Sequence, residues 1–233
     1  MDNDSRRFRD IKEHFSLEAG DFDSIIADRV PFYDLFIRAL VNVLPFKKDK
    51  AIRIADLGCG TGTISFYVKE IFPNAEIDCV DFSSEMLESA RKKLGRFKGI
   101  RYFESDILKF NLIGYDAVLS SLCLHHIGKE KEKKGFFKQV YNSLLEGGVF
   151  YIYDVILASN SVVQEVFLEE WKKFMSKNLS VEDVEKTIQK YYDEDRPLAL
   201  MDELNRLEET GFRDVDVICK FYNGAVYGGI RRD

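Results

Sequence analysis

The sequence lacks a basic surplus, a long apolar run and a paired set of cysteines. Its 34 lysines and arginines against 40 aspartates and glutamates give a net charge of −6, which is not the electrostatic pattern of a protein that binds a nucleic-acid backbone. No apolar run approaches the roughly 18 residues that a membrane-spanning helix needs. The first ten residues, MDNDSRRFRD, are too polar for a signal peptide. We therefore expect a cytoplasmic protein whose partners include neither a membrane nor a nucleic acid.

Cysteine and histidine are also scarce. The four cysteines are far apart and form no C-x-x-C pair: Cys59, Cys79, Cys123 and Cys219. This scatter argues against a disulfide framework and predicts reduced, half-buried thiols. The chain has three histidines, and no group of His, Asp and Glu has metal-ligand spacing, so we expect no metal site.

Hydrophobic residues are plentiful, at 45% of the 233 residues, which suits one sizeable α/β domain. From about residue 51 the apolar pattern alternates between short strands and amphipathic helices. The expected strands are 52–56, 77–80, 100–103, 115–120 and 149–155, and Gly147-Gly148 is expected to stop the helix before the last of them. Such alternation predicts a parallel sheet that is covered by helices on both faces.

The segments around this alternation complete the predicted architecture. A polar start and an amphipathic helix precede it, two inserted helices follow the fifth strand, and a last helix leads to a hairpin. Asn223-Gly224 is a strong signal for the hairpin's tight turn. We predict one domain, 1–233, with a helical lid (1–49), a cofactor-binding core (50–155), a helical insert that forms an acceptor lid (156–197), and a last helix with a β-hairpin (198–233).

A glycine-rich loop follows the first expected strand, as Asp56-Leu57-Gly58-Cys59-Gly60-Thr61-Gly62. Glycines at this place let the backbone turn sharply and approach a ligand at the ends of the strands. A dinucleotide loop would need a third glycine where Thr63 stands, and a phosphate loop would continue with G-K-[ST]. The spacing is D-x-G-x-G-x-G instead, and a purely structural turn is the alternative.

Two carboxylates follow at the ends of the next strands. Asp81 can accept both hydroxyls of a ribose, or it can simply favour the next helix through the helix dipole. Asp106 can accept from an adenine amine while the Ile107 N–H donates to a ring nitrogen; otherwise it is a solvated turn residue. Phe82 and Met86 would supply apolar walls for the base.

Taken together, these residues resemble the class I S-adenosylmethionine-dependent methyltransferases, over about 51–155 and the final hairpin. The resemblance implies a Rossmann-like, mostly parallel seven-stranded sheet with a C-terminal antiparallel hairpin. It also implies S-adenosyl-L-methionine as cofactor and S-adenosyl-L-homocysteine as product. The methionine end would be held by Asp56 and the backbone of Gly58, Cys59 and Gly60. Ser121 would line the sulfonium region, and Tyr33 would close over the cofactor unless it is a plain core residue.

The chemistry that this family performs is an in-line displacement, which depends mostly on orientation. A general base is needed only if the acceptor must lose a proton. His125, His126 and Asp154 follow the fourth and fifth strands and are candidate catalytic residues, although a histidine here could equally pack against the next helix. Aromatic residues of the insert hint at a small-molecule acceptor. The sequence leaves open whether the protein forms a homodimer.

Three alternatives remain open. Val30-Pro31-Phe32-Tyr33 and the position of the insert are similar to the carboxy-S-adenosylmethionine synthases of tRNA modification. Those enzymes look to need an arginine in the insert, and around Trp171 this chain offers only Lys172 and Lys173, which lack a planar pair of donors. The loop also reads G-C-G, not G-C-S. The others are a non-catalytic S-adenosylmethionine-binding protein and an NAD-dependent oxidoreductase, which Thr63 disfavours.

Overall fold

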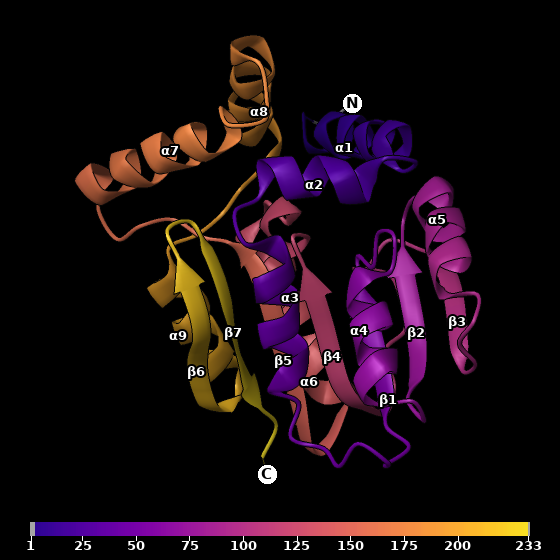
Figure 1. Ribbon diagram of the computed structural model, residues 1–233. Helices are drawn as coiled ribbons and strands as arrows, with labels where there is room; N and C mark the ends of the chain where they lie inside the picture. The colour runs from indigo at the N-terminus through magenta and orange to yellow at the C-terminus, as the bar shows by residue number, and fades with distance from the viewer. Residues whose placement is uncertain (1–2, 233) are drawn as a thin grey trace.

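A seven-stranded sheet forms the centre of the computed structural model, which describes residues 3–232 (Figure 1). The strands are β1 (Arg53–Leu57), β2 (Glu76–Asp81), β3 (Ile100–Glu104), β4 (Tyr115–Ser121), β5 (Leu144–Val155), β6 (Arg213–Phe221) and β7 (Gly224–Ile230). Their order is β3-β2-β1-β4-β5-β7-β6, and β7 is antiparallel to both of its neighbours. The predicted Rossmann-like sheet with its C-terminal hairpin is confirmed.

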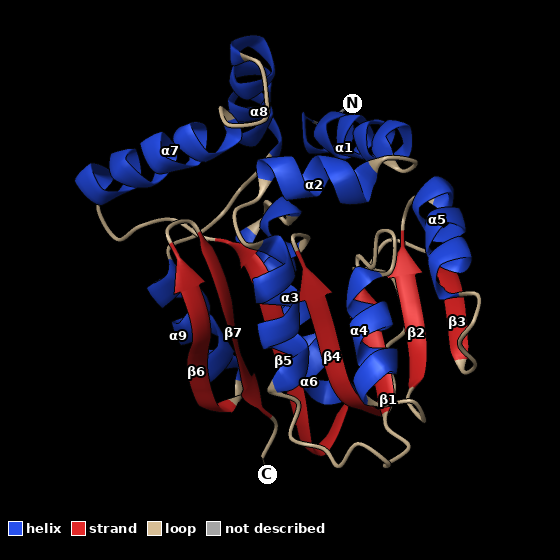
Figure 2. Cartoon of the chain, viewed as in Figure 1, coloured by secondary structure: helices blue, strands red, loops and turns tan. Residues whose placement is uncertain are grey.

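Helices cover both faces of this sheet (Figure 2). The helices are α1 (Asn3–Glu18), α2 (Phe22–Arg29), α3 (Tyr33–Asn42), α4 (Thr63–Ile71), α5 (Ser84–Leu94), α6 (Glu130–Ser143), α7 (Ser161–Met175), α8 (Val181–Glu194) and α9 (Leu200–Thr210). Apolar side chains of α3, α4 and α5 form one core with the sheet, and those of α6 and α9 form a second core. The central strands are therefore buried on both faces, which explains their continuous apolar sequences.

The N-terminal segment, which the sequence pattern indicates only as a polar start, is helical. It forms two helices, α1 and α2, which lie across the carboxyl ends of the strands (Figure 1). The few apolar residues of α1 suffice because Ile11 is almost completely buried, where α1 packs against α5 and α8. Tertiary packing here stabilises a helix that the sequence pattern alone hides. The predicted insert forms α7 and α8, above the same edge of the sheet.

Two local predictions about turns are wrong. The pair Gly147-Gly148 does not stop α6, which ends at Ser143; it lies inside β5, where Gly147 has a φ of 75°. The hairpin turn is Tyr222-Asn223 rather than Asn223-Gly224, because Phe221 pairs with Gly224 in the sheet. In both places the glycine belongs to a paired strand, so the presence of a glycine does not mark the position of the turn.

The state of the cysteines and the character of the helices are also predicted from the sequence. All four cysteines are free; Cys59 and Cys79 are buried, and Cys123 and Cys219 are partly buried. Between residues 3 and 232, none of the helices combines the length and the apolar character needed to cross a membrane.

Candidate functional site

A cavity lies between the carboxyl ends of the strands and the helices above them. Its floor comes from the glycine loop and the ends of β2 and β4, and its cover comes from α1, α2, α7 and α8. This is the edge where an open α/β sheet binds its ligands. The floor includes Gly58, Cys59, Gly60, Asp81, Ser121 and Cys123, and the cover includes His14, Phe15, Arg29, Trp171, Tyr191 and Glu194.

The two glycines at the start of the loop serve different purposes. Gly58 has a φ of 67°, and a Cβ placed on it would lie 2.3 Å from Sγ of Cys123, so no larger residue fits there. Gly60 has a φ of 51°, but a Cβ there would meet nothing within 4 Å. Gly58 is therefore needed for packing against Cys123, and Gly60 mainly for its backbone conformation beside the cavity.

Asp81 fixes the loop from the end of β2. Its carboxylate accepts hydrogen bonds from the backbone N–H groups of Gly60 at 2.8 Å and Ser83 at 2.9 Å. Burial raises the pKa of this carboxyl above its usual value. Ser83 caps α5 by accepting from the Met86 N–H. Asp81 thus reaches the cavity wall from a rigid strand end, as a ribose ligand must.

Asp56 lies beneath the loop and is completely buried. One carboxylate oxygen accepts from the hydroxyl of Ser65 at 2.6 Å and from its N–H at 3.2 Å. The other oxygen has no hydrogen-bond partner among the described residues. Burial outweighs the bonds from Ser65 and raises the pKa of Asp56 to about 7. An unsatisfied buried oxygen below a glycine loop fits a site that receives a polar, positively charged group.

The other predicted cofactor residues divide into two groups. Tyr33, Phe82, Met86 and Ser121 line the cavity. Asp106 and Ile107 lie outside its lining: the Asp106 carboxylate accepts from the Leu108 N–H at 2.9 Å and pairs with Lys109 at 3.4 Å. The structure thus brings the loop, Asp81 and the apolar walls together, while the adenine contact of Asp106 and Ile107 stays a prediction.

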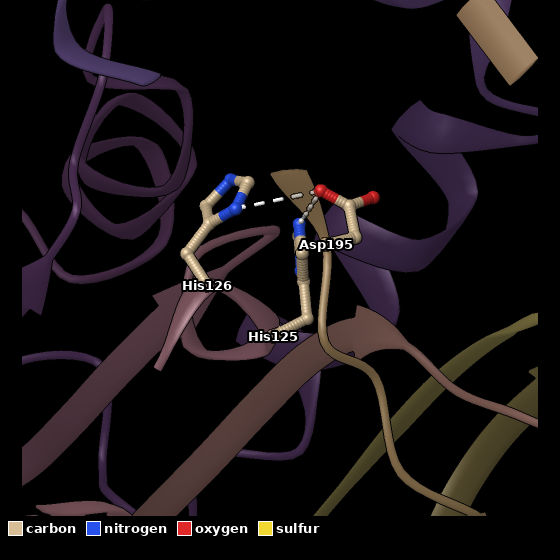
Figure 3. A group of neighbouring side chains, drawn as sticks. All are labelled: His125, His126 and Asp195. Carbon is tan, nitrogen blue, oxygen red and sulfur yellow. Dashed lines mark ion pairs between the residues drawn. The ribbon is translucent and has the colours of Figure 1, made fainter. Parts of the chain in front are cut away.

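The candidate catalytic residues form a buried group. Nδ1 of His125 forms a hydrogen bond with the Asp154 carboxylate, and Nε2 lies 3.5 Å from Oδ1 of Asp195. His126 lies beside it, with Nδ1 3.4 Å from the same oxygen (Figure 3). Burial alone would lower the pKa of His125, but the two aspartates outweigh it and raise the pKa to about 10. Burial and the neighbouring His125 lower the pKa of His126 to about 3.

These pKa values give the two histidines different protonation states. At neutral pH, His125 is charged and donates hydrogen bonds, whereas His126 is neutral. The third partner, Asp195, was missed by sequence reasoning. It follows α8, far along the chain from the histidines, and no motif marks it; only the folding of the insert over the sheet brings it there.

Ion pairs join the helices of the cover. Arg29 donates to both carboxylate oxygens of Glu18, at 2.9 and 3.0 Å. His14 lies between Glu18 and Glu194, at 3.2 and 3.0 Å, and Lys190 lies 3.6 Å from Glu18. Burial opposes the charge of His14, but its two glutamates raise its pKa to about 8. Helices α1, α2 and α8 are thus held together by charges that face the cavity.

Several known proteins are similar to this chain in sequence. A family model described as "Methyltransferase domain" matches residues 55–150. The carboxy-S-adenosyl-L-methionine synthase of Campylobacter curvus is 30% identical over 72% of this chain and 73% of its own. That of Nautilia profundicola is 22% identical over 93% of this chain and 94% of its own.

Solved structures show the same fold at lower identity. Human N-acetylserotonin methyltransferase in complex with S-adenosylmethionine superposes with a TM-score of 0.60 at 15% identity, over 86% of this chain and 53% of that chain. A Haemonchus contortus phosphoethanolamine N-methyltransferase gives a TM-score of 0.64 at 15% identity, over the same shares. The chain belongs to the class I S-adenosylmethionine-dependent methyltransferase family, and within it is similar to the carboxy-S-adenosyl-L-methionine synthases.

Proposed function

We propose that the protein binds S-adenosylmethionine in this cavity and converts it to a carboxylated form, as the name of its relatives describes. In this reaction the methyl carbon loses a proton and forms a bond to the carboxyl carbon that a second, carboxylate-bearing substrate releases as carbon dioxide, and the remainder of that substrate takes up the proton. The observation that carries this proposal is the extent of the similarity. Some of these relatives, such as that of Nautilia profundicola, align over more than nine tenths of the chain, so the similarity extends over the lid and the insert as well as the cofactor-binding core. The lid and the insert build the part of the cavity that would receive a second substrate.

The floor of the cavity accounts for the binding of S-adenosylmethionine. The unsatisfied oxygen of Asp56 lies below the glycine loop, where the methionine end would be held. Asp81 would accept the ribose hydroxyls, and Phe82 and Met86 would flank the base. The sulfonium makes the attached methyl carbon reactive, and the role of the protein is to orient it and to exclude water.

The cover supplies an arginine, a residue that α7 and α8 of the insert lack. Arg29 comes from α2 and lines the cavity, where a single terminal nitrogen of its guanidinium donates to both carboxylate oxygens of Glu18. A guanidinium can also donate to a carboxylate from two nitrogens at once, which a lysine cannot do. A carboxylate of the second substrate would therefore bind by exchanging with Glu18 on Arg29. The lysines Lys172 and Lys173 are not needed for this purpose.

Methyl transfer to a small molecule is the second candidate, and the charges of the cavity favour it. Arg29, His14 and Lys190 are each paired with a glutamate, so an uncharged acceptor would fit without any exchange. The loop also has Gly60 where the sequence pattern of the synthases has serine. On this reading, the aromatic rings of Trp171 and Tyr191 would pack against the acceptor.

One experiment separates the two candidates. The purified chain is incubated with S-adenosylmethionine labelled with ¹³C in its methyl group and with a bacterial metabolite extract, and the products are followed by mass spectrometry. Carboxylation gives a labelled adenosyl compound that is heavier by one carbon dioxide. Methyl transfer gives unlabelled S-adenosylhomocysteine and a different labelled product. If neither forms, and the chain does not bind S-adenosylhomocysteine, both proposals fail.

A further inference from the structure

His125, His126 and Asp195 each turn a metal-binding atom toward a common point (Figure 3). These three atoms lie within 4.8 Å of one another. Two of the separations are shorter: Nε2 of His125 and Nδ1 of His126 lie 3.5 and 3.4 Å from Oδ1 of Asp195. Zinc–nitrogen and zinc–oxygen bonds of about 2.0–2.1 Å at tetrahedral angles place neighbouring ligand atoms about 3.3–3.4 Å apart. Two edges of the triangle therefore already have the spacing of a metal site.

The surroundings of His125 match those of a metal-ligating histidine. Its Nδ1 is bonded to the buried carboxylate of Asp154, which fixes the ring and directs Nε2 toward Asp195. A metal-bound histidine usually has such a carboxylate on its other nitrogen, where it sets the tautomer and makes the ligand more basic. An ion would take the place of the proton on Nε2 of His125, and the bond to Asp154 would be kept.

His126 provides a separate observation. Both of its ring nitrogens are buried, and neither has a hydrogen-bond partner among the described residues. Its Nδ1 points toward Asp195 at a distance too long for a good hydrogen bond. Buried polar atoms without partners are rare in native proteins and often mark a bound water or ion. His126 is therefore placed to be a ligand, and its ring is held by the edge of Phe15.

Two carboxylates provide the negative charge that a bound cation needs. They come from Asp154 and Asp195. The positive groups that face them are Arg7, whose guanidinium donates to the His126 carbonyl oxygen at 2.9 Å, and Arg196, whose charge acts on Asp195. All three candidate ligands line the cavity. A bound ion would thus have its remaining coordination positions open to the cavity, for water or an oxygen atom of a substrate.

We propose that His125, His126 and Asp195 form a binding site for a divalent transition-metal ion such as Zn²⁺ at the edge of the cavity. Two imidazoles and one carboxylate suit zinc and its first-row neighbours, and they are poor ligands for Mg²⁺ or Ca²⁺. The proposal stands independently of the carboxylation reaction, because it concerns the binding of the ion to the chain alone.

The test uses the untagged full chain after treatment with a chelator. With histidine labelled by ¹⁵N, the three histidines give three sets of imidazole signals in nuclear magnetic resonance spectra. Zinc should shift the signals of His125 and His126 strongly and leave those of His14 nearly unchanged. Calorimetry should give one zinc ion per chain, and an excess of Mg²⁺ should not compete. A spectrum in which zinc shifts no histidine signals, or only those of His14, would overturn the proposal.

Variants and a second metal locate the site. Asp195→Asn should weaken zinc binding by at least about tenfold, and Asp154→Asn by about 10–100-fold through its contact with His125. Asp193→Asn is the matched control, since Asp193 is an exposed aspartate on the same segment. The absorption spectrum of the chain with Co²⁺ in place of Zn²⁺ shows whether the ion is bound by these three residues or by the cysteines near the loop. An intense near-ultraviolet band from thiolate ligands, or zinc affinity unchanged in both Asp195→Asn and Asp154→Asn, would contradict the proposal.

Discussion

The indole nitrogen of Trp171 donates a hydrogen bond to the backbone carbonyl of Arg29, which is 2.6 Å away in space and 142 residues away in sequence. This bond joins α7 of the insert to the end of α2 in the N-terminal segment. The Trp171 ring also packs edge-on against Tyr191 of α8. One residue therefore connects three of the four helices that cover the cavity.

Trp171 should report on ligand binding. It is the single tryptophan of the chain, and it lines the cavity, so S-adenosylhomocysteine should change its fluorescence. Trp171→Phe keeps an aromatic ring beside Tyr191 but loses a hydrogen bond worth about 1 kcal/mol, so we expect binding about fivefold weaker by calorimetry. Tyr192→Phe, at an exposed ring, is the control. Equal affinity in Trp171→Phe and wild type would mean that the contact does not hold the cover.

Asp81 should control affinity for the adenosyl ligand. Hydrogen bonds to a charged group contribute about 1.5–3 kcal/mol, so Asp81→Asn should bind S-adenosylhomocysteine about 10–100-fold more weakly. Glu88→Gln on α5 is the control, because Glu88 is exposed and pairs only with Lys92 in the contacts described. Calorimetry and thermal unfolding of both variants separate loss of binding from loss of the fold. An unchanged affinity in Asp81→Asn would rule out its role as the ribose ligand.

The two loop glycines should differ in their tolerance of a side chain. Gly58→Ala combines backbone strain of about 1–2 kcal/mol with overpacking of about 1–3 kcal/mol against Cys123. Gly60→Ala has the strain alone, because its Cβ enters open space. Urea unfolding should therefore show Gly58→Ala to be the less stable by about 2 kcal/mol. Equal stabilities would show that Cys123 moves aside at little cost.

Much of this fold follows from local pattern, and the exceptions have physical causes. The loop and the strands before and after it are predictable because β1 and β2 are short segments with several apolar residues, and β1 is followed by Gly58 while β2 ends in Asp81. Helix α1 is not, because its sequence is polar and Ile11 finds its core on other helices. Asp195 is not, because its meeting with His125 depends on how the insert folds back over the sheet.

The stability of the cover should depend on the charge of His14. Its pKa in the folded protein is about 8, above the ordinary value of 6.5. The charged form of His14 therefore stabilises the folded protein fully below about pH 6.5, and this contribution is lost as the pH rises through 8. His14→Gln should lower the free energy of unfolding by on the order of 1–2 kcal/mol at about pH 6, and by clearly less at about pH 9. A difference that stays constant across this range would show that the charge of His14 does not matter.

Arg29 tests the exchange of carboxylates in the proposed reaction. Arg29→Lys keeps the positive charge but loses the planar guanidinium, which can donate to a substrate carboxylate from two nitrogens at once. Formation of the carboxylated product should fall by about tenfold or more, since one bidentate contact with a carboxylate is lost. The affinity for S-adenosylhomocysteine should change much less. Lys172→Arg is the control on the insert, and a rise in product with that variant would place the carboxylate site on α7 instead.

Several polar contacts join the two halves of the cover, which are α1 with α2 and α7 with α8. Besides the bond from Trp171 to Arg29, Asn178 donates to Asp28 at 2.8 Å and Arg7 donates to the Glu194 carbonyl oxygen at 2.6 Å. Water can replace each of these bonds at a small net cost. We therefore expect small molecules to enter and leave the cavity where the two halves part while the sheet stays folded, so that the rate of exchange depends on two segments that lie before and after the cofactor-binding core in the sequence.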